Sequence, residues 1–467
     1  MRTATNRKKK RGTGPPRMVQ IQPSAGRLAK LDRGFDLNGN AVTSGLLTNK
    51  YVQPTVHVFT VSLFLYAIYQ TFAGPQDGGT NFGAVAFFGL WWAPVMLVSL
   101  LLVGRAWCYF CPIGAITDFL QRFSLNRRFP TFLKPNWKVL GLNLSVLSIA
   151  AVTFLFARLP LYKFGVSYTP WKAGIYFLIF LVLAVGLTLV FRQRVFCRYF
   201  CPATGVMTVT ARLSPIELRQ DRETDVPDCM TAEFKSEYLS TERRCVSCMN
   251  CVTGQPEVPA RLRFRWPGSG AVRQRILLAD EALIALIIWA VFPVDHVLGS
   301  AITENIPAIQ ALPGIWAGTL PYFMSVAATI LGFAAVNRIA AWWSGLDARE
   351  TFIRFAFAYA PLGIMFQLGR HVVTGLLENG GGLVNNFAAG LGVGLDLPVA
   401  WASPGAIAAW SQFSASGGLW LGVVWGGVIA WAIASDMADA TERRLKAVLP
   451  HLAFMAAVTF AVVTHLT

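Results

Sequence analysis

The residues of this 467-residue chain best suited to chemistry are eight cysteines in four groups. Along the chain they are Cys108 and Cys111, then Cys197 and Cys201, then the lone Cys229, and finally Cys245, Cys248 and Cys251. A proline closes each of the first two groups. Soft thiolates that converge at such short spacings are the ligands of iron–sulfur cubes. The eight cysteines therefore predict two [4Fe-4S] clusters, and the second depends on Cys229 as its fourth ligand.

Other roles for cysteine compete with this interpretation. A single Cys-x-x-Cys can hold zinc or act as a redox dithiol, and scattered cysteines in apolar helices are usually inert. Here the groups end apolar segments or sit among charged residues, which favours iron–sulfur ligation. Disulfides are not expected, because the topology derived below places the thiols on the reducing cytoplasmic side.

The elements that must position these thiols are membrane spans. Hydrophobic residues make up 54% of the chain and charged residues 14%, a composition typical of membrane proteins. The expected fold is therefore an all-α polytopic membrane protein with about nine transmembrane helices. The apolar windows are 55–73, 84–104, 138–158, 173–191, 276–294, 315–336, 353–377, 417–435 and 447–466.

The distribution of charge predicts the orientation of the chain. Its net charge of +17 is carried by Lys and Arg clusters between the apolar windows, so it indicates positive-inside topology and not a nucleic-acid partner. A basic run at 7–11 precedes the first window, whereas the loop 74–80 contains no Lys or Arg. We expect the N-terminus and the clusters on the cytoplasmic side of a bacterial inner membrane, with the C-terminus outside.

Four regions follow from this pattern. They are a basic disordered tail at 1–50, a four-helix membrane module with two Cys-Pro motifs at 51–211, a small cytoplasmic ferredoxin-like segment at 212–274, and a C-terminal membrane domain of about five helices at 275–467.

The membrane module contains an internal repeat in which two spans, an arginine and a Cys-Pro loop occur in the same order. A short amphipathic segment follows each loop, at 117–124 and at 207–214. Two such repeats side by side would bring Cys108, Cys111, Cys197 and Cys201 together. Three arginines would then offset the negative charge of a thiolate-bound cube, or else act as interfacial anchors. They are Arg105, Arg194 and Arg198.

The C-terminal domain contains a second candidate site. Arg370 and His371 lie inside an apolar window, and a cation within the membrane is costly enough to suggest function. With His296 and His465 predicted on the same side, the histidines could ligate a haem b or accept a proton from quinol. The alternative, which we favour, is that Arg370 snorkels or pairs with Glu378 and that the histidines are interfacial.

At residues 105–115 and 196–205 the chain reads Arg-Ala-Trp-Cys-Tyr-Phe-Cys-Pro-Ile-Gly-Ala and Phe-Cys-Arg-Tyr-Phe-Cys-Pro-Ala-Thr-Gly. These motifs resemble those of the NapH/NosR-type membrane polyferredoxins, and the resemblance covers roughly residues 50–260. It implies electron transfer from the quinol pool in respiration. The first motif has two residues between its cysteines where the family usually has three. The last cysteine group runs into 253–257 where the family would show a closing Cys-Pro.

These features predict a membrane-bound iron–sulfur protein that relays electrons between the quinol pool, or a membrane partner, and a cytoplasmic or periplasmic oxidoreductase. It would then be a quinol-dehydrogenase-type subunit. The second hypothesis is an assembly factor for a respiratory metalloenzyme, in which the clusters reduce a metal ion or a protein thiol. A transporter with a structural metal site is a third, and it predicts polar residues along the spans, of which few beyond Arg370 are visible.

Overall fold

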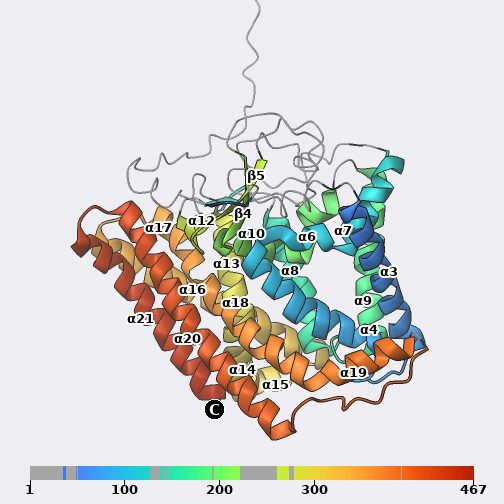
Figure 1. Ribbon diagram of the computed structural model, residues 1–467. Coiled ribbons are helices and arrows are strands. Elements are labelled where there is room, and N and C mark those ends of the chain that lie inside the picture. Colours follow the sequence, from blue (N-terminus) through green and yellow to red (C-terminus); the bar gives the residue numbers. More distant parts are fainter. Residues whose placement is uncertain are drawn as a thin grey trace, which may run out of the picture.

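The computed structural model describes residues 35–37, 49, 51–125, 127, 137–139, 142–144, 147–191, 194–220, 260–272, 278–390 and 392–466. Within these residues the chain is mostly helical, and its long helices run between two ends of the molecule (Figure 1). Seven helices are long and apolar enough to cross a membrane, as in a multi-pass membrane protein. They are Val52–Ala73, Pro170–Val190, Ala279–Asn305, Gly314–Ser344, Ala348–Val372, Pro404–Met437 and Thr441–Leu466.

Each of these seven helices covers one of the nine predicted windows, at least in large part. The window 84–104 falls on a helical run that consists of α4 (Phe82–Val85), η2 (Ala86–Leu97) and α5 (Val98–Val103). The start of the predicted helix at 138–158 is wrong, because strands β2 (Trp137–Val139) and β3 (Leu142–Leu144) pair there. The helix that follows them, α8, extends from Leu147 to Lys163. Nine crossings stay a prediction.

The first Cys-Pro loop follows the helical run that begins with α4 and ends with α5. Gly104 has a φ of 61°, a conformation that glycine adopts without strain, and it turns the chain into η3 (Gly104–Ala106). The short helix α6 (Trp107–Phe110) then leads to Cys111, and α7 (Pro112–Leu120) and η4 (Gln121–Phe123) follow. The first Cys-Pro loop therefore consists of two short helices, α6 and α7, that meet at Cys111 and directly follow an apolar helix.

The second loop repeats this arrangement after α9 (Pro170–Val190). A π-helical turn, η6 (Phe196–Phe200), leads to Cys201, and α10 (Pro202–Leu213) begins at the next residue. Both α7 and α10 start with proline, whose missing N–H costs nothing at a position where no intrahelical partner exists. The predicted repeat is thus present in the structure as well as in the sequence.

A small antiparallel sheet lies at the end of the helices where the Cys-Pro loops are found (Figure 1). Its central strand β5 (Ala260–Phe264) pairs with β4 (Ile216–Gln220) on one side and with β1 (Phe35–Asp36) on the other. The chain therefore leaves the helices along β4 and returns beside it along β5. Residues 221–259, with Cys229, Cys245, Cys248 and Cys251, lie outside the described residues.

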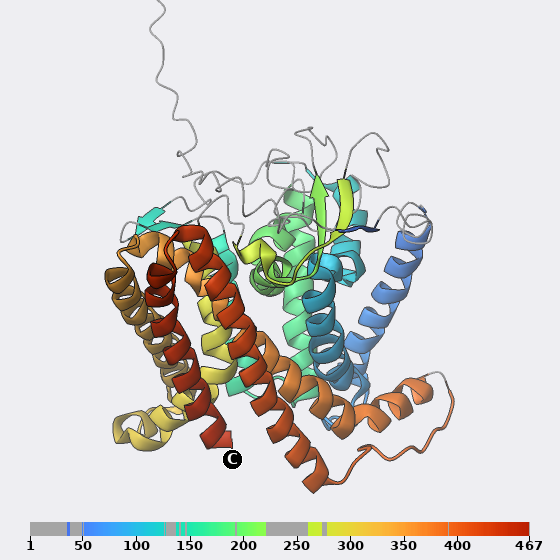
Figure 2. The same ribbon diagram turned by 60° about the vertical axis from the view of Figure 1, so that its left-hand side comes forward.

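The C-terminal half is a bundle of helical elements of different lengths. They are α13 (Ala279–Trp289), η8 (Ala290–Gly299), α14 (Ser300–Asn305), α15 (Pro307–Gln310), α16 (Gly314–Ser344), α17 (Ala348–Phe355), η9 (Ala356–Ala358), α18 (Ala360–Gln367), η10 (Leu368–Val373), α19 (Thr374–Gly390), α20 (Pro404–Met437) and α21 (Thr441–Leu466). Figure 2 shows α19 and the C-terminus at the end of the bundle away from the sheet. A single core cluster of buried residues extends from the first Cys-Pro loop into this bundle.

Helix α10 lies inside the molecule and not at its surface. Every residue from Thr204 to Leu213 is buried, although the segment includes three threonines and Arg212. The amphipathic segment expected at 207–214 is thus helical for most of its length, but its polar face is buried as well as its apolar one. Helices α8 and α13 and the turn η3 pack around α10 and remove from water the face that would otherwise be solvated.

Candidate metal centre

The second cysteine of each Cys-Pro loop occupies the same position in its local structure. Cys111 has φ −67° and ψ 119°, and Cys201 has φ −68° and ψ 119°. The proline that follows disfavours helical angles at the preceding residue, so each cysteine becomes the extended cap of the next helix. Both thiols therefore stand at a helix N-terminus, where the helix dipole stabilises negative charge.

The fold brings the four described cysteines, two from each loop, into one buried site. Cys108 is 9% exposed and the other three are half-buried, and every pair of the four thiols interacts electrostatically. Among the described residues, no three His, Cys, Asp or Glu side chains are close enough to share one metal ion. Four cysteine thiolates are the usual ligand set of a [4Fe-4S] cluster.

Burial dominates the acid–base behaviour of these thiols. It raises the pKa of Cys111 to about 12 and that of Cys201 to about 11, and it raises the pKa of Cys197 well above its ordinary value. Neighbouring thiols add to this effect, while backbone hydrogen bonds from Gly114, Ala203 and Thr204 oppose it. A reactive dithiol needs a lowered pKa, and the burial of these thiols acts in the opposite direction.

Buried arginines connect the two repeats. Arg194 lies three residues before Cys197 and donates two hydrogen bonds to the carboxylate of Asp118, on helix α7 of the other repeat. Its side chain is 1% exposed. A methyl group placed on Gly114 would lie 3.3 Å from Arg194 Nη1 and 3.6 Å from Cys111 Cβ, so these two atoms are at most about 7 Å apart. The cation therefore lies beside the thiols.

Arg105 makes the reciprocal connection. It lies three residues before Cys108, and its guanidinium donates to the Thr208 hydroxyl and to the Thr204 carbonyl oxygen at 3.4 Å, both on α10. Thr208 is seven residues after Cys201, as Asp118 is seven residues after Cys111. The two arginines thus meet equivalent positions of opposite repeats. One of them meets a carboxylate and the other a neutral hydroxyl.

The interfacial-anchor alternative for the three predicted arginines is wrong, because all of them are buried. Arg105 is 3% exposed, Arg194 1% and Arg198 8%. Arg198 also stacks on the ring of Tyr199, with its Cζ 4.9 Å from the ring centroid. The arginines therefore place positive charge inside the protein, where it is screened least.

Sequence reasoning missed several neighbours of the thiols. The Sγ of Cys108 lies 3.3 Å from the Sδ of Met207, and the Nε2 of His57, on α3 (Val52–Ala73), is 2.9 Å from the carbonyl oxygen of Tyr109. Asp118 and Thr208 were not predicted either. An alignment of the two repeats on their Cys-Pro motifs would have found this last pair, because its members occupy equivalent positions.

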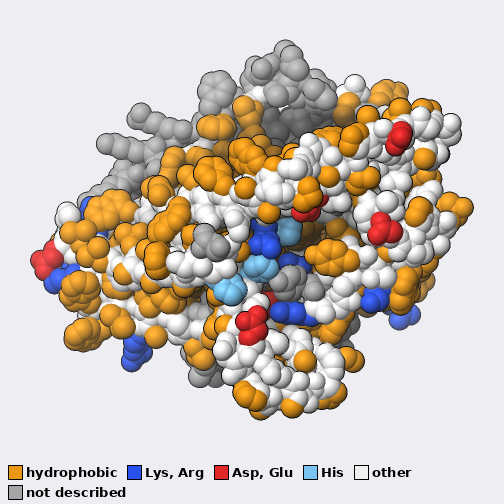
Figure 3. All heavy atoms as spheres, turned by 90° about the horizontal axis from the view of Figure 1, so that it is seen from below, with side chains coloured by type: hydrophobic (Ala, Val, Ile, Leu, Met, Phe, Trp, Pro, Cys, Tyr) orange, Lys and Arg blue, Asp and Glu red, His pale blue; other side chains and the backbone are white. Residues whose placement is uncertain are grey.

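The C-terminal candidate residues lie elsewhere. Arg370, His296 and His465 line a pocket at the end of the helices opposite the sheet (Figure 3), whereas His371 is not among its lining residues. The predicted ion pair between Arg370 and Glu378 is not formed among the described residues, although both line this pocket. A haem b or quinol site there stays a prediction.

The residues present at the Cys-Pro loops fit a [4Fe-4S] cluster. Four cysteines converge from the two Cys-Pro loops, two of them at helix N-termini, and two buried arginines would balance the charge of a thiolate-bound group. Such a cluster, when bound, supplies one-electron transfer. The chain contributes the ligands, excludes water from them and sets the charge around them.

Comparison with known proteins identifies the same two segments. The model of a family described as a 4Fe-4S binding domain matches residues 85–130 and 173–219, one Cys-Pro loop in each. The "Putative electron transport protein YccM" of Escherichia coli (strain K12) is 22% identical over 220 residues, which cover 42% of this chain and 61% of the relative. The "Uncharacterized protein MJ0749" of Methanocaldococcus jannaschii is 26% identical over 172 residues, which cover 34% and 64%.

The chain thus spans about three fifths of each of these two relatives. No solved structure matches it. Over residues 85–130 and 173–219, this chain is therefore similar to a 4Fe-4S binding domain.

Proposed function

We propose that this protein transfers electrons at a membrane by means of a [4Fe-4S] cluster held between its two Cys-Pro loops. Its ligands would be Cys108, Cys111, Cys197 and Cys201. The observation that carries the proposal is the convergence of these four thiols, every pair of which interacts electrostatically. Four thiolates are the usual ligand set of this cofactor.

The surroundings of the thiols support a redox role. Arg194 holds positive charge inside the protein beside Cys111, and Arg105 is buried three residues before Cys108. Positive charge near the ligands favours the reduced, more negative state. Backbone N–H groups of Gly114, Ala203 and Thr204 hydrogen-bond to the sulfurs, and such bonds raise the reduction potential. The chain thereby sets the potential without touching the iron.

For the remaining cysteines we propose a second cluster, bound by Cys229, Cys245, Cys248 and Cys251. The donor would be quinol or another membrane redox partner, and the acceptor a cytoplasmic or periplasmic oxidoreductase. The name of the relative, "Putative electron transport protein YccM", supports a role in electron transfer. Strands β4 and β5, which precede and follow these cysteines in the sequence, are paired at the end of the helices where the Cys-Pro loops are found.

The test is anaerobic purification of the full chain in detergent, with iron and acid-labile sulfide counted and EPR spectra recorded before and after dithionite. About eight irons per chain are expected, four for each cube. Cys201→Ser and Cys248→Ser should each remove about four of them. Thr210→Ser, a small change on the same helix as Cys201, serves as the matched control and should keep the full count. Zinc or no metal in the wild-type chain would refute the proposal.

Electron relay and enzyme assembly give different results in a second measurement. For a relay, a soluble quinol analogue should reduce the EPR-detected clusters of the purified wild-type chain, and Cys201→Ser should lack the part of the signal that comes from the cluster at the Cys-Pro loops. Failure of the quinol analogue, together with oxidation of the reduced clusters by a metal ion or a protein disulfide, would favour the assembly role.

A further inference from the structure

A pocket of about 600 Å³ opens at the end of the helices opposite the Cys-Pro loops. Figure 3 shows it from that end as a hollow with histidine, basic and acidic side chains at its mouth and hydrophobic side chains around it. Its volume lies within the range of small-molecule sites, roughly 300–1,000 Å³. Six helical elements contribute to it: η8, α14, η10, α19, α20 and α21.

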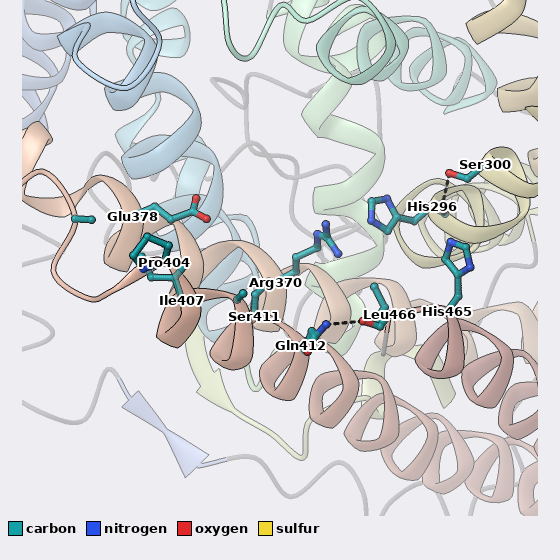
Figure 4. A pocket seen from close by; sticks show the side chains of 12 residues that line it. His296, Ser300, Arg370, Glu378, Pro404, Ile407, Ser411, Gln412, His465 and Leu466 are labelled. Carbon is teal, nitrogen blue, oxygen red and sulfur yellow. Dashed lines mark hydrogen bonds between the residues drawn. The ribbon is translucent and has the colours of Figure 1, made fainter. Parts of the chain in front are cut away.

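Three nitrogen-bearing side chains from different elements face one space in this pocket (Figure 4). They are His296 of η8, Arg370 of η10 and His465 of α21. The wall also contains an apolar part, in which Ile407 and Leu466 take part. The arrangement therefore offers several donors on one side and a hydrophobic surface on the other.

Arg370 brings positive charge to the polar side of the pocket, and Glu378, which lines the same pocket, interacts with it electrostatically. Within the described part of the chain, Arg370 makes no ion pair of 4.0 Å or less. Arg370, Lys163 and Arg158 all act electrostatically on His296. Of these cations, Lys163 is offset by Asp295 at 3.5 Å. A cation in a membrane-spanning helix is costly unless something pairs with it, so a bound anion would stabilise this end of the protein.

We propose that the pocket binds a phosphate group, with Arg370 as the charged donor and His296 and His465 as further donors. A planar carboxylate is satisfied by one arginine fork, whereas a tetrahedral phosphate offers acceptors in several directions and suits donors that converge from three helices. Ile407 and Leu466 contact the apolar part of the ligand. The phosphate belongs either to a phospholipid headgroup that enters from the bilayer or to a soluble phosphorylated molecule.

The position of the pocket separates this role from electron transfer. The thiols lie at the opposite end of helices that are long enough to cross a bilayer core of about 30 Å. A redox ligand bound here would be too distant to exchange electrons directly with a cluster held by the four described cysteines. The phosphate site therefore stands independently of the function proposed above.

The test is isothermal titration calorimetry on the full chain in detergent, with short-chain dihexanoyl phosphatidylglycerol and inorganic phosphate as probes. Wild-type protein should bind at least one of them, and Arg370→Gln should weaken that binding at least about tenfold, as expected for a hydrogen bond to a charged group. Arg370→Lys should recover part of the loss. The matched control is Arg338→Gln, which removes an exposed arginine of α16 outside the pocket lining and should leave binding unchanged.

The outcomes separate the two sources and the alternatives. Binding of phosphatidylglycerol without binding of phosphate identifies a lipid headgroup, and binding of phosphate identifies a soluble ligand. His465→Phe, a change of an exposed side chain, should weaken binding severalfold without a loss of folded protein. The proposal is refuted if neither probe binds, if Arg370→Gln and wild type bind equally, or if dihexanoyl glycerol without phosphate binds as well as the phospholipid.

Discussion

Replacement of Arg194 by Gln should lower the reduction potential of a cluster held by the Cys-Pro loops. The Nη1 of Arg194 is at most about 7 Å from Cys111 Cβ, and its side chain is 1% exposed. A unit charge at about 7 Å contributes about 2 kcal/mol at an effective dielectric constant of about 20. For a one-electron couple this corresponds to a potential about 100 mV lower without the arginine.

The opposite substitution should give the opposite sign. Asp118→Asn removes a negative charge next to the same arginine, so the potential should rise, but by less, because Asp118 is 23% exposed and solvent screens it. The assay is an EPR-monitored redox titration of anaerobically purified protein with its iron content verified. Arg122→Gln is the matched control, since Arg122 is exposed and its loss should have little effect. Shifts of the same sign for the Arg194 and Asp118 variants, or none in either, would refute this electrostatic reasoning.

Three further predictions concern the C-terminal half. Glu281→Gln breaks the buried ion pair with Arg212, in which both side chains are at most 2% exposed, and should lower the free energy of unfolding by about 3–5 kcal/mol in detergent denaturation. His451→Phe leaves the buried hydroxyl of Tyr359 without its 2.9 Å hydrogen bond to Nδ1 and should cost about 1–3 kcal/mol. A double variant with Tyr359→Phe should recover most of that loss in the same assay. Burial raises the pKa of Glu378 above 4.5, and Arg370 opposes this effect. Phosphatidylglycerol binding should therefore weaken as the pH rises through that raised pKa and the carboxylate becomes negative, and Glu378→Gln should abolish this dependence in calorimetry.

Hydropathy was sufficient to predict the seven long apolar helices, because an uninterrupted apolar run is a property of the local sequence. It failed at residues 137–144, where an apolar stretch forms the paired strands β2 and β3 and the helix starts only at Leu147. Composition alone does not distinguish a short buried strand from a helix. The acidic residue Glu281 at the start of α13 is buried because it pairs with Arg212, which lies far away in the sequence.

The candidate site was predictable as far as the cysteines are concerned, because their spacing and the prolines are visible in the sequence. The partners of the buried arginines were not predictable from the sequence. Arg194 could reach Asp118 only if the two repeats pack face to face, and hydropathy contains no information about that packing. The same holds for the pocket at the opposite end, whose walls come from four stretches of the chain separated by many residues.

Helix α10 explains why the two halves of the chain cannot be treated as separate domains. Its N-terminus carries Cys201, and its buried Arg212 pairs with Glu281 of α13 and stacks on Phe357 at 4.9 Å. The C-terminal helices therefore form one wall around the helix that presents a proposed ligand. A sequence boundary near residue 275 marks the return of the chain to the membrane, but it does not divide the packing. Substitutions in the C-terminal bundle that loosen this wall should consequently admit water to the thiols.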